Sequence, residues 1–116
     1  MNPFVEFRPS RPGRFQVSFP DNDPSKGVVA SAIVGIQDPR EFARAFFAAL
    51  QGDKKAVGFV DGQNEACLTI TEGEVLAELD LPDGTEDFAV PWNVFSSVLE
   101  DWIQAWSDAQ VAKAGT

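Results

Sequence analysis

Two absences restrict the side chains that could carry out chemistry in this chain. The sequence contains no His and no Tyr, and it has a single Cys, Cys67. Because Ser and Cys nucleophiles need an activating base, usually His, neither a Ser-His-Asp triad nor a Cys-His pair can form. A His-ligated zinc site and a Cys-based metal cluster are excluded in the same way. Cys67 falls in a predicted strand, where we interpret it as a small packing residue.

Carboxylates are the abundant groups that remain for acid and base chemistry. Glycosidases use a carboxylate pair, but they place it in the deep cleft of a larger fold, whereas this chain has 116 residues. The loop at 21–27, Asp-Asn-Asp-Pro-Ser-Lys-Gly, resembles the start of a calcium loop. Its Gly falls one position late, and Ala32 stands where a bidentate Glu is needed. We therefore read this loop as a turn and expect no metal, no cofactor and no catalytic residue.

The net charge of −9 is distributed unevenly along the chain. Residues 1–55 contain eight basic and six acidic side chains, a net charge of +2. Residues 56–116 contain one basic side chain, Lys113, and twelve acidic ones, a net charge of −11. Such a segment cannot neutralise itself by local ion pairs. Its acids can serve solubility alone, or they can steer the protein toward a basic protein surface. Nucleic-acid binding is disfavoured because phosphates are bound by Lys and Arg clusters.

Length and composition indicate one domain, 1–116, with enough apolar material for a core, including ten Phe and three Trp. The sequence has no apolar run long enough for a membrane span, so we expect no membrane partner. Its first residues lack the basic segment and apolar stretch of a secretory signal. A cytoplasmic location is the expectation that follows.

The first half of the chain predicts a hairpin, a strand and a helix. Residues 4–8 and 14–19 flank a Pro- and Gly-containing turn and form the hairpin. Residues 28–36 are apolar almost throughout, as in a strand covered on both faces. Asp38 and Pro39 then provide the N-cap and first position of a helix that ends at Gly52.

The second half predicts a strand at 56–60, a hairpin over 65–81, a short extended piece at 88–90 and a closing helix that starts at Pro91. The hairpin turns at Glu72-Gly73, so that Ile70 pairs with Val75 on an apolar face. The opposite face then gathers four acids without any basic residue. They are Glu65, Glu74, Glu78 and Asp80. We take this face as the candidate partner-binding site, with a merely solvated face as the alternative.

The closing helix carries a wide apolar stripe that should pack on the sheet. Its Trp102 and Trp106 are added to the candidate partner-binding residues, because Trp is enriched at interfaces. We expect residues 111–116 to fray. The element order is strand, strand, strand, helix, strand, strand, strand, helix. The expected fold is therefore α+β, with a mostly antiparallel sheet of five to six strands and two helices packed on one face.

This order and composition resemble those of small acidic bacterial immunity proteins, which neutralise a toxin. The shared features are the N-terminal hairpin, the strand that follows it, the helix beginning Asp38-Pro39, the three-strand meander and the closing amphipathic helix at 91–106. The resemblance implies a non-catalytic inhibitor that covers a basic protein such as a toxin or effector. Two alternatives stay open, namely an acidic dimeric chaperone or adaptor for a secreted effector, and a carboxylate-based enzyme. The sequence leaves open whether the protein is a monomer or a homodimer.

Overall fold

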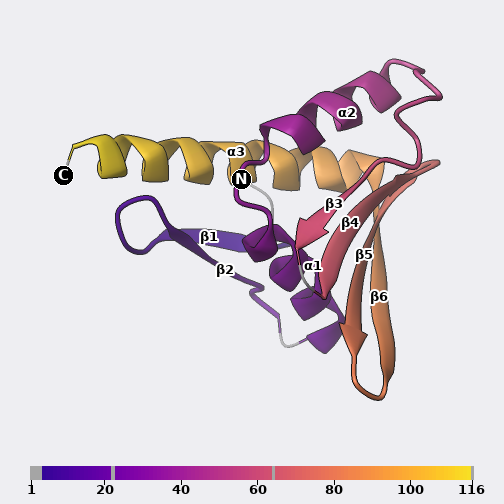
Figure 1. Cartoon of the computed structure of the whole chain (residues 1–116), viewed down its shortest axis with the longest axis horizontal. Helices are drawn as coiled ribbons and strands as arrows, with labels where there is room; N and C mark the ends of the chain where they lie inside the picture. Colours follow the sequence, from indigo (N-terminus) through magenta and orange to yellow (C-terminus); the bar gives the residue numbers. More distant parts are fainter. Residues whose placement is uncertain (1–3, 22, 64, 116) are drawn as a thin grey trace.

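The computed structural model describes residues 4–21, 23–63 and 65–115, which form two antiparallel sheets and three helices (Figure 1). The elements in order are β1 (Glu6–Pro9), β2 (Phe15–Ser18), α1 (Pro24–Gly35), α2 (Arg40–Leu50), β3 (Val60–Gln63), β4 (Ala66–Thr71), β5 (Glu74–Leu81), β6 (Gly84–Pro91) and α3 (Trp92–Ala114). The predicted α+β class is confirmed. The single sheet of five to six strands with two helices is wrong, because β1 and β2 form a sheet of their own and β3–β6 form a second one.

The largest correction concerns residues 28–36, which are helical up to Gly35 instead of forming a strand. The helix starts inside the predicted loop, where the Asp23 carboxylate accepts the Ser25 N–H at 3.0 Å and Pro24 takes the first helical position. α1 lies between the two sheets and packs on β4, β5 and β6 as well as on β2 (Figure 1). A helix covered on several sides is apolar nearly all round, so its sequence lacks the period that marks a surface helix.

The helix predicted after Asp38 and Pro39 is confirmed as α2, which begins at Arg40, one residue later than predicted. The Asp38 carboxylate still performs the expected capping role, since it accepts the Arg40 N–H at 2.9 Å. Phe42 and Phe46 are fully buried, whereas Phe47 on the neighbouring face of the helix is 42% exposed. α2 therefore presents one aromatic face to the rest of the core.

The β4–β5 hairpin has the predicted register. Ile70 pairs with Val75, Leu68 with Ala77 and Ala66 with Leu79. Two flanking strands extend this hairpin to a four-stranded sheet in the order β3-β4-β5-β6. The predicted strand at 56–60 is a turn as far as residue 58, and the strand begins only at Val60. The short extended piece at 88–90 is part of the longer strand β6.

One face of the four-stranded sheet, its inner face, joins the helices in a continuous hydrophobic cluster. α3 begins next to the β4–β5 turn, where the Trp92 N–H donates to the Gly73 carbonyl at 3.0 Å and Trp92 Nε1 donates to the Glu74 carbonyl at 2.9 Å. α3 continues to Ala114 and passes beyond the sheet along the β1–β2 hairpin (Figure 1). The fraying expected at 111–116 stays a prediction, and its last residue lies outside the described residues.

Candidate functional site

The outer face of the four-stranded sheet, opposite the helices, collects the predicted acids. Glu74 and Glu78 alternate along β5 with the buried Val75 and Ala77, and Asp80 follows two residues later. Glu65 lies across from Asp80, whose N–H donates to the Glu65 carbonyl at 2.8 Å. The structure therefore brings the four predicted acids to one face, as the hairpin register requires.

A fifth acid, Asp87 on β6, joins this face because it pairs directly with Glu78. We call the five carboxylates the acidic face: Glu65, Glu74, Glu78, Asp80 and Asp87. Sequence reasoning missed Asp87 because it did not pair 84–91 with the preceding strand. The turn signal Pro82-Asp83-Gly84, placed directly after β5, could have found this pairing.

The acidic face has no cation to balance it within the described part of the chain. No Lys or Arg occurs between residues 56 and 112 of the sequence. The ion pairs formed among the described residues are local pairs of the N-terminal half, between Arg8 and Glu6, Lys26 and Asp21, and Arg40 and Asp38. Like charges on paired residues, such as Glu78 and Asp87, repel each other. The acidic face thus holds unbalanced negative charge on a rigid sheet.

An apolar row crosses the four strands within the acidic face. Val60, Thr69, Leu76 and Ala89 are successive partners from β3 to β6. The Val60 side chain is 55% exposed, Leu76 is half-buried and Ala89 is exposed. Glu74 borders the row on one side, and the other acids border it on the opposite side. An apolar centre with a charged rim is the usual anatomy of a protein–protein interface.

Cys67 lies on the same face, opposite Glu78 on the neighbouring strand. Burial raises the pKa of the Cys67 thiol above its ordinary value, and the negative charges of Glu78 and Asp80 raise it further. The group is therefore a poor nucleophile at neutral pH, since the thiolate is the reactive form. Its titration nevertheless reports the electrostatic potential of the acidic face.

We expect the combined variant Glu78→Gln with Asp80→Asn to make the Cys67 thiol more reactive. Removing two negative charges lowers the thiol pKa, so a larger fraction is thiolate at pH 8 and alkylation by iodoacetamide becomes faster. The measurement is the pH profile of the alkylation rate. The matched control, Glu41→Gln with Glu100→Gln, removes two exposed acids from the helices and should leave that profile in place. Identical profiles for all three proteins would contradict the described position of Cys67.

The two predicted Trp residues do not join the acidic face. Trp102 is fully buried in the core cluster, with its ring centroid 6.3 Å from that of Phe42, so it cannot contact a partner in this structure. Trp106 is half-buried under the guanidinium of Arg40, which lies 4.8 Å from the ring centroid. Asp38 holds that guanidinium through two side-chain nitrogens, at 3.0 and 2.7 Å. Both Trp side chains connect α3 to α2 and its N-terminal cap.

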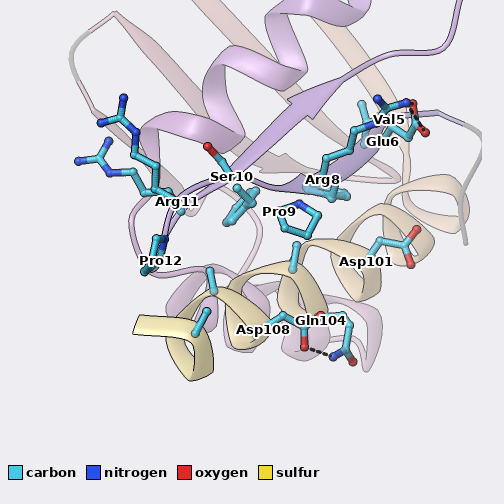
Figure 2. A pocket seen from close by; sticks show the side chains of 16 residues that line it. Val5, Glu6, Arg8, Pro9, Ser10, Arg11, Pro12, Asp101, Gln104 and Asp108 are labelled. Atoms are coloured by element: carbon cyan, nitrogen blue, oxygen red, sulfur yellow. Dashed lines mark hydrogen bonds and ion pairs between the residues drawn. The ribbon is translucent and has the colours of Figure 1, made fainter. Parts of the chain in front are cut away.

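A groove of about 780 Å³ opens between β1 with its following turn and the C-terminal half of α3 (Figure 2). Its walls are mainly apolar, and they include Phe7, Pro9 and Phe15 on the hairpin and Ala105 and Ala109 on α3. No sequence signal marked this groove, because it forms between segments about 100 residues apart that meet only in the folded chain.

Within the described ranges, no group of three or more acidic or Cys side chains is arranged to hold a metal ion.

The helices of the structure bear on whether the chain can cross a membrane. Of those that the structure describes, none combines sufficient length with sufficient apolar character to cross a bilayer. Comparisons of the chain with protein-family models, with curated proteins and with solved structures give no significant match. The acidic face and the groove are therefore supported only by the sequence and the geometry of this chain.

Proposed function

We propose that this chain is a non-catalytic binding protein of the inhibitor or immunity type, whose acidic face covers a basic surface of a protein partner. The observation that carries the proposal is the acidic face itself. Five carboxylates share one sheet face, and none of them forms an ion pair with another described residue. A basic partner would supply the cations that the chain itself does not place there.

The apolar row gives this face a means of holding a partner as well as attracting it. Val60, Leu76 and Ala89 can lose water on contact, while the surrounding carboxylates select a surface rich in Lys and Arg. Charge complementarity raises the association rate and rejects acidic competitors. The four hydrogen-bonded strands fix the spacing of these groups, so that little order has to be gained on binding.

The proposal is tested by using the intact chain as bait in an extract of the source cells. Proteins retained at low salt and released at high salt are purified, and their affinity is measured by calorimetry. We expect a basic partner that binds the acidic face. Charge reversal of two acids, Glu78→Lys with Asp80→Lys, should weaken its binding by about a hundredfold, because it places like charges opposite each other across the interface.

A matched control distinguishes an effect at the acidic face from an effect of the overall net charge. The variant Glu41→Lys with Glu100→Lys makes the same charge change on exposed positions of α2 and α3, and it should bind like the unchanged chain apart from a small salt-dependent effect. Equal loss in both variants would mean that only net charge matters. An activity assay of the purified partner adds the functional readout. An inhibitor abolishes that activity at a 1:1 ratio, whereas an adaptor or chaperone leaves it intact.

A further inference from the structure

The groove between β1 and α3 has the size of a ligand site and lies apart from the acidic face. Its volume of about 780 Å³ falls within the ~300–1,000 Å³ typical of small-molecule pockets. Aromatic rings line its hairpin side, with the centroids of Phe7 and Phe15 5.7 Å apart, and Ala side chains leave room on α3. A lining of this kind suits an apolar chain.

The turn after β1 closes one end of the groove and fixes its width. The Gly13 N–H donates to the Ala109 carbonyl of α3 at 2.9 Å. Gly13 has a φ of 80°, and a Cβ at this position would lie 3.0 Å from the Lys113 side chain. Glycine is therefore suited to both the backbone conformation and the close approach to α3. The hairpin and the helix are thus joined at the end of the groove instead of being free to move apart.

The charges along the groove give it a polarity. Arg8 is paired with Glu6 at 3.2 Å (Figure 2). Asp108 accepts a hydrogen bond from the neutral Gln104 amide at 2.9 Å and keeps its negative charge (Figure 2). Arg11, which Figure 2 shows at the turn end, and Arg14 form no ion pair with any other described residue. A further lining acid, Asp101 on α3, lies toward the opposite end, on the same side as Glu6 (Figure 2). The turn end therefore carries two arginines that no lining carboxylate pairs with, Asp108 lies between the two ends on α3, and Glu6 and Asp101 lie at the other end (Figure 2).

The backbone of the hairpin wall disfavours a peptide as the occupant. A peptide strand is held at a sheet edge by main-chain hydrogen bonds, and proline has no N–H to contribute. Pro9 and Pro12 both line the groove, so two donors are missing from this wall. A ligand without a peptide backbone does not need them.

We propose that the groove binds a small amphipathic molecule that has an apolar chain and one anionic group. The apolar chain lies between the Phe side chains of the hairpin and the Ala side chains of α3. The anionic group lies at the turn end, within reach of the Arg11 and Arg14 guanidinium groups. Charge-assisted hydrogen bonds to Arg are among the strongest that a protein can offer to a carboxylate.

Calorimetric titration of the full chain with decanoate, below its micellar range, tests this proposal. We expect 1:1 binding that is about tenfold tighter than that of decan-1-ol or decyltrimethylammonium, since only decanoate offers an anion to the arginines. The variant Arg11→Gln with Arg14→Gln should reduce decanoate to the affinity of the alcohol. Its matched control, Arg44→Gln with Lys54→Gln, removes two exposed cations from elsewhere and should leave the affinity unchanged.

A second pair of variants tests the apolar part of the site. Ala105→Leu fills the groove and should weaken the binding of decanoate and of decanol alike by about tenfold or more. The control Ser97→Leu adds the same side chain to an exposed position of α3 and should leave both affinities unchanged. Ala112→Leu, at an exposed lining position, replaces Ala105→Leu if the latter fails to fold by circular dichroism.

Several results of the decanoate titrations would overturn the proposal. They are absence of decanoate binding, equal binding of all three amphiphiles, and decanoate binding that is unchanged in the folded groove-filling variant. Tighter binding of an acidic amphipathic peptide than of decanoate would also overturn it, in favour of a peptide groove. The reversal Glu78→Lys with Asp80→Lys should not alter decanoate binding, so this test can fail without affecting the proposed function of the acidic face.

Discussion

Replacing Phe42 by Ala is expected to lower the free energy of unfolding by about 3–5 kcal/mol. The Phe42 ring is fully buried, and its centroid lies 6.0, 5.8 and 6.3 Å from those of Phe59, Phe95 and Trp102. Truncation removes these contacts and leaves a cavity between α2 and α3 that the surrounding rings can only partly fill. Because small domains are stable by only ~5–15 kcal/mol, a large fraction of the stability is lost. Urea unfolding followed by Trp fluorescence measures the change.

The matched control is Phe47→Ala, which removes the same side chain from the neighbouring face of α2. Phe47 is 42% exposed, so its loss should cost less than about 1 kcal/mol. Both variants should keep the urea m-value of the unchanged chain, because the surface exposed on unfolding differs little. Similar destabilisation by the two variants would show that α2 does not pack on α3 through its Phe42 face.

Replacing Gly62 by Ala is the second change for which we expect a large effect, a loss of about 3 kcal/mol. A Cβ at Gly62 would lie 2.3 Å from the Ala66 carbonyl oxygen and 2.5 Å from Cys67 Cα. These are backbone atoms of β4, so the clash can be relieved only by moving β3 away from its partner strand. The free energy of unfolding and the alkylation rate of Cys67 report the two consequences, lower stability and a more accessible thiol.

Gly35→Ala serves as the comparison for this prediction, because its Cβ would meet the Gln63 backbone at an ordinary 3.7 Å. Gly35 ends α1, and Ala is the better helix former, so its stability should change by less than ~1 kcal/mol and in the favourable direction. If Gly62→Ala were as stable as Gly35→Ala, the close pairing of β3 with β4 would be wrong.

The sequence predicted the elements whose pattern has a clear period or clear end signals. The β4–β5 register followed from alternation around a two-residue turn, and the structure has the same pairs from Thr71–Glu74 to Ala66–Leu79. α2 followed from a helical apolar stripe and the cap at Asp38. These signals are local, so they hold without knowledge of the tertiary packing.

Residues 28–36 form a helix up to Gly35 although their sequence predicts a strand, because β-branched side chains and burial on several sides look alike in a strand and in an enclosed helix. The start signal Asp23-Pro24 is of the same kind as Asp38-Pro39 and would have indicated the helix. The sequence located four of the five carboxylates of the acidic face. It could not locate the groove or the burial of Trp102, since both depend on how α3 packs against distant segments.

The sequence of helix α1 also makes the chain prone to aggregation whenever this helix is exposed. Residues 27–37 contain no charge and are rich in Val and Ile, which is the composition of segments that assemble into cross-β fibrils when exposed. Lys26 and Asp38 flank this segment as charged gatekeepers, and the four-stranded sheet keeps it helical and covered. Any change that loosens the core, including Phe42→Ala, should therefore shorten the lag time of fibril growth on heating more than its effect on stability alone would suggest.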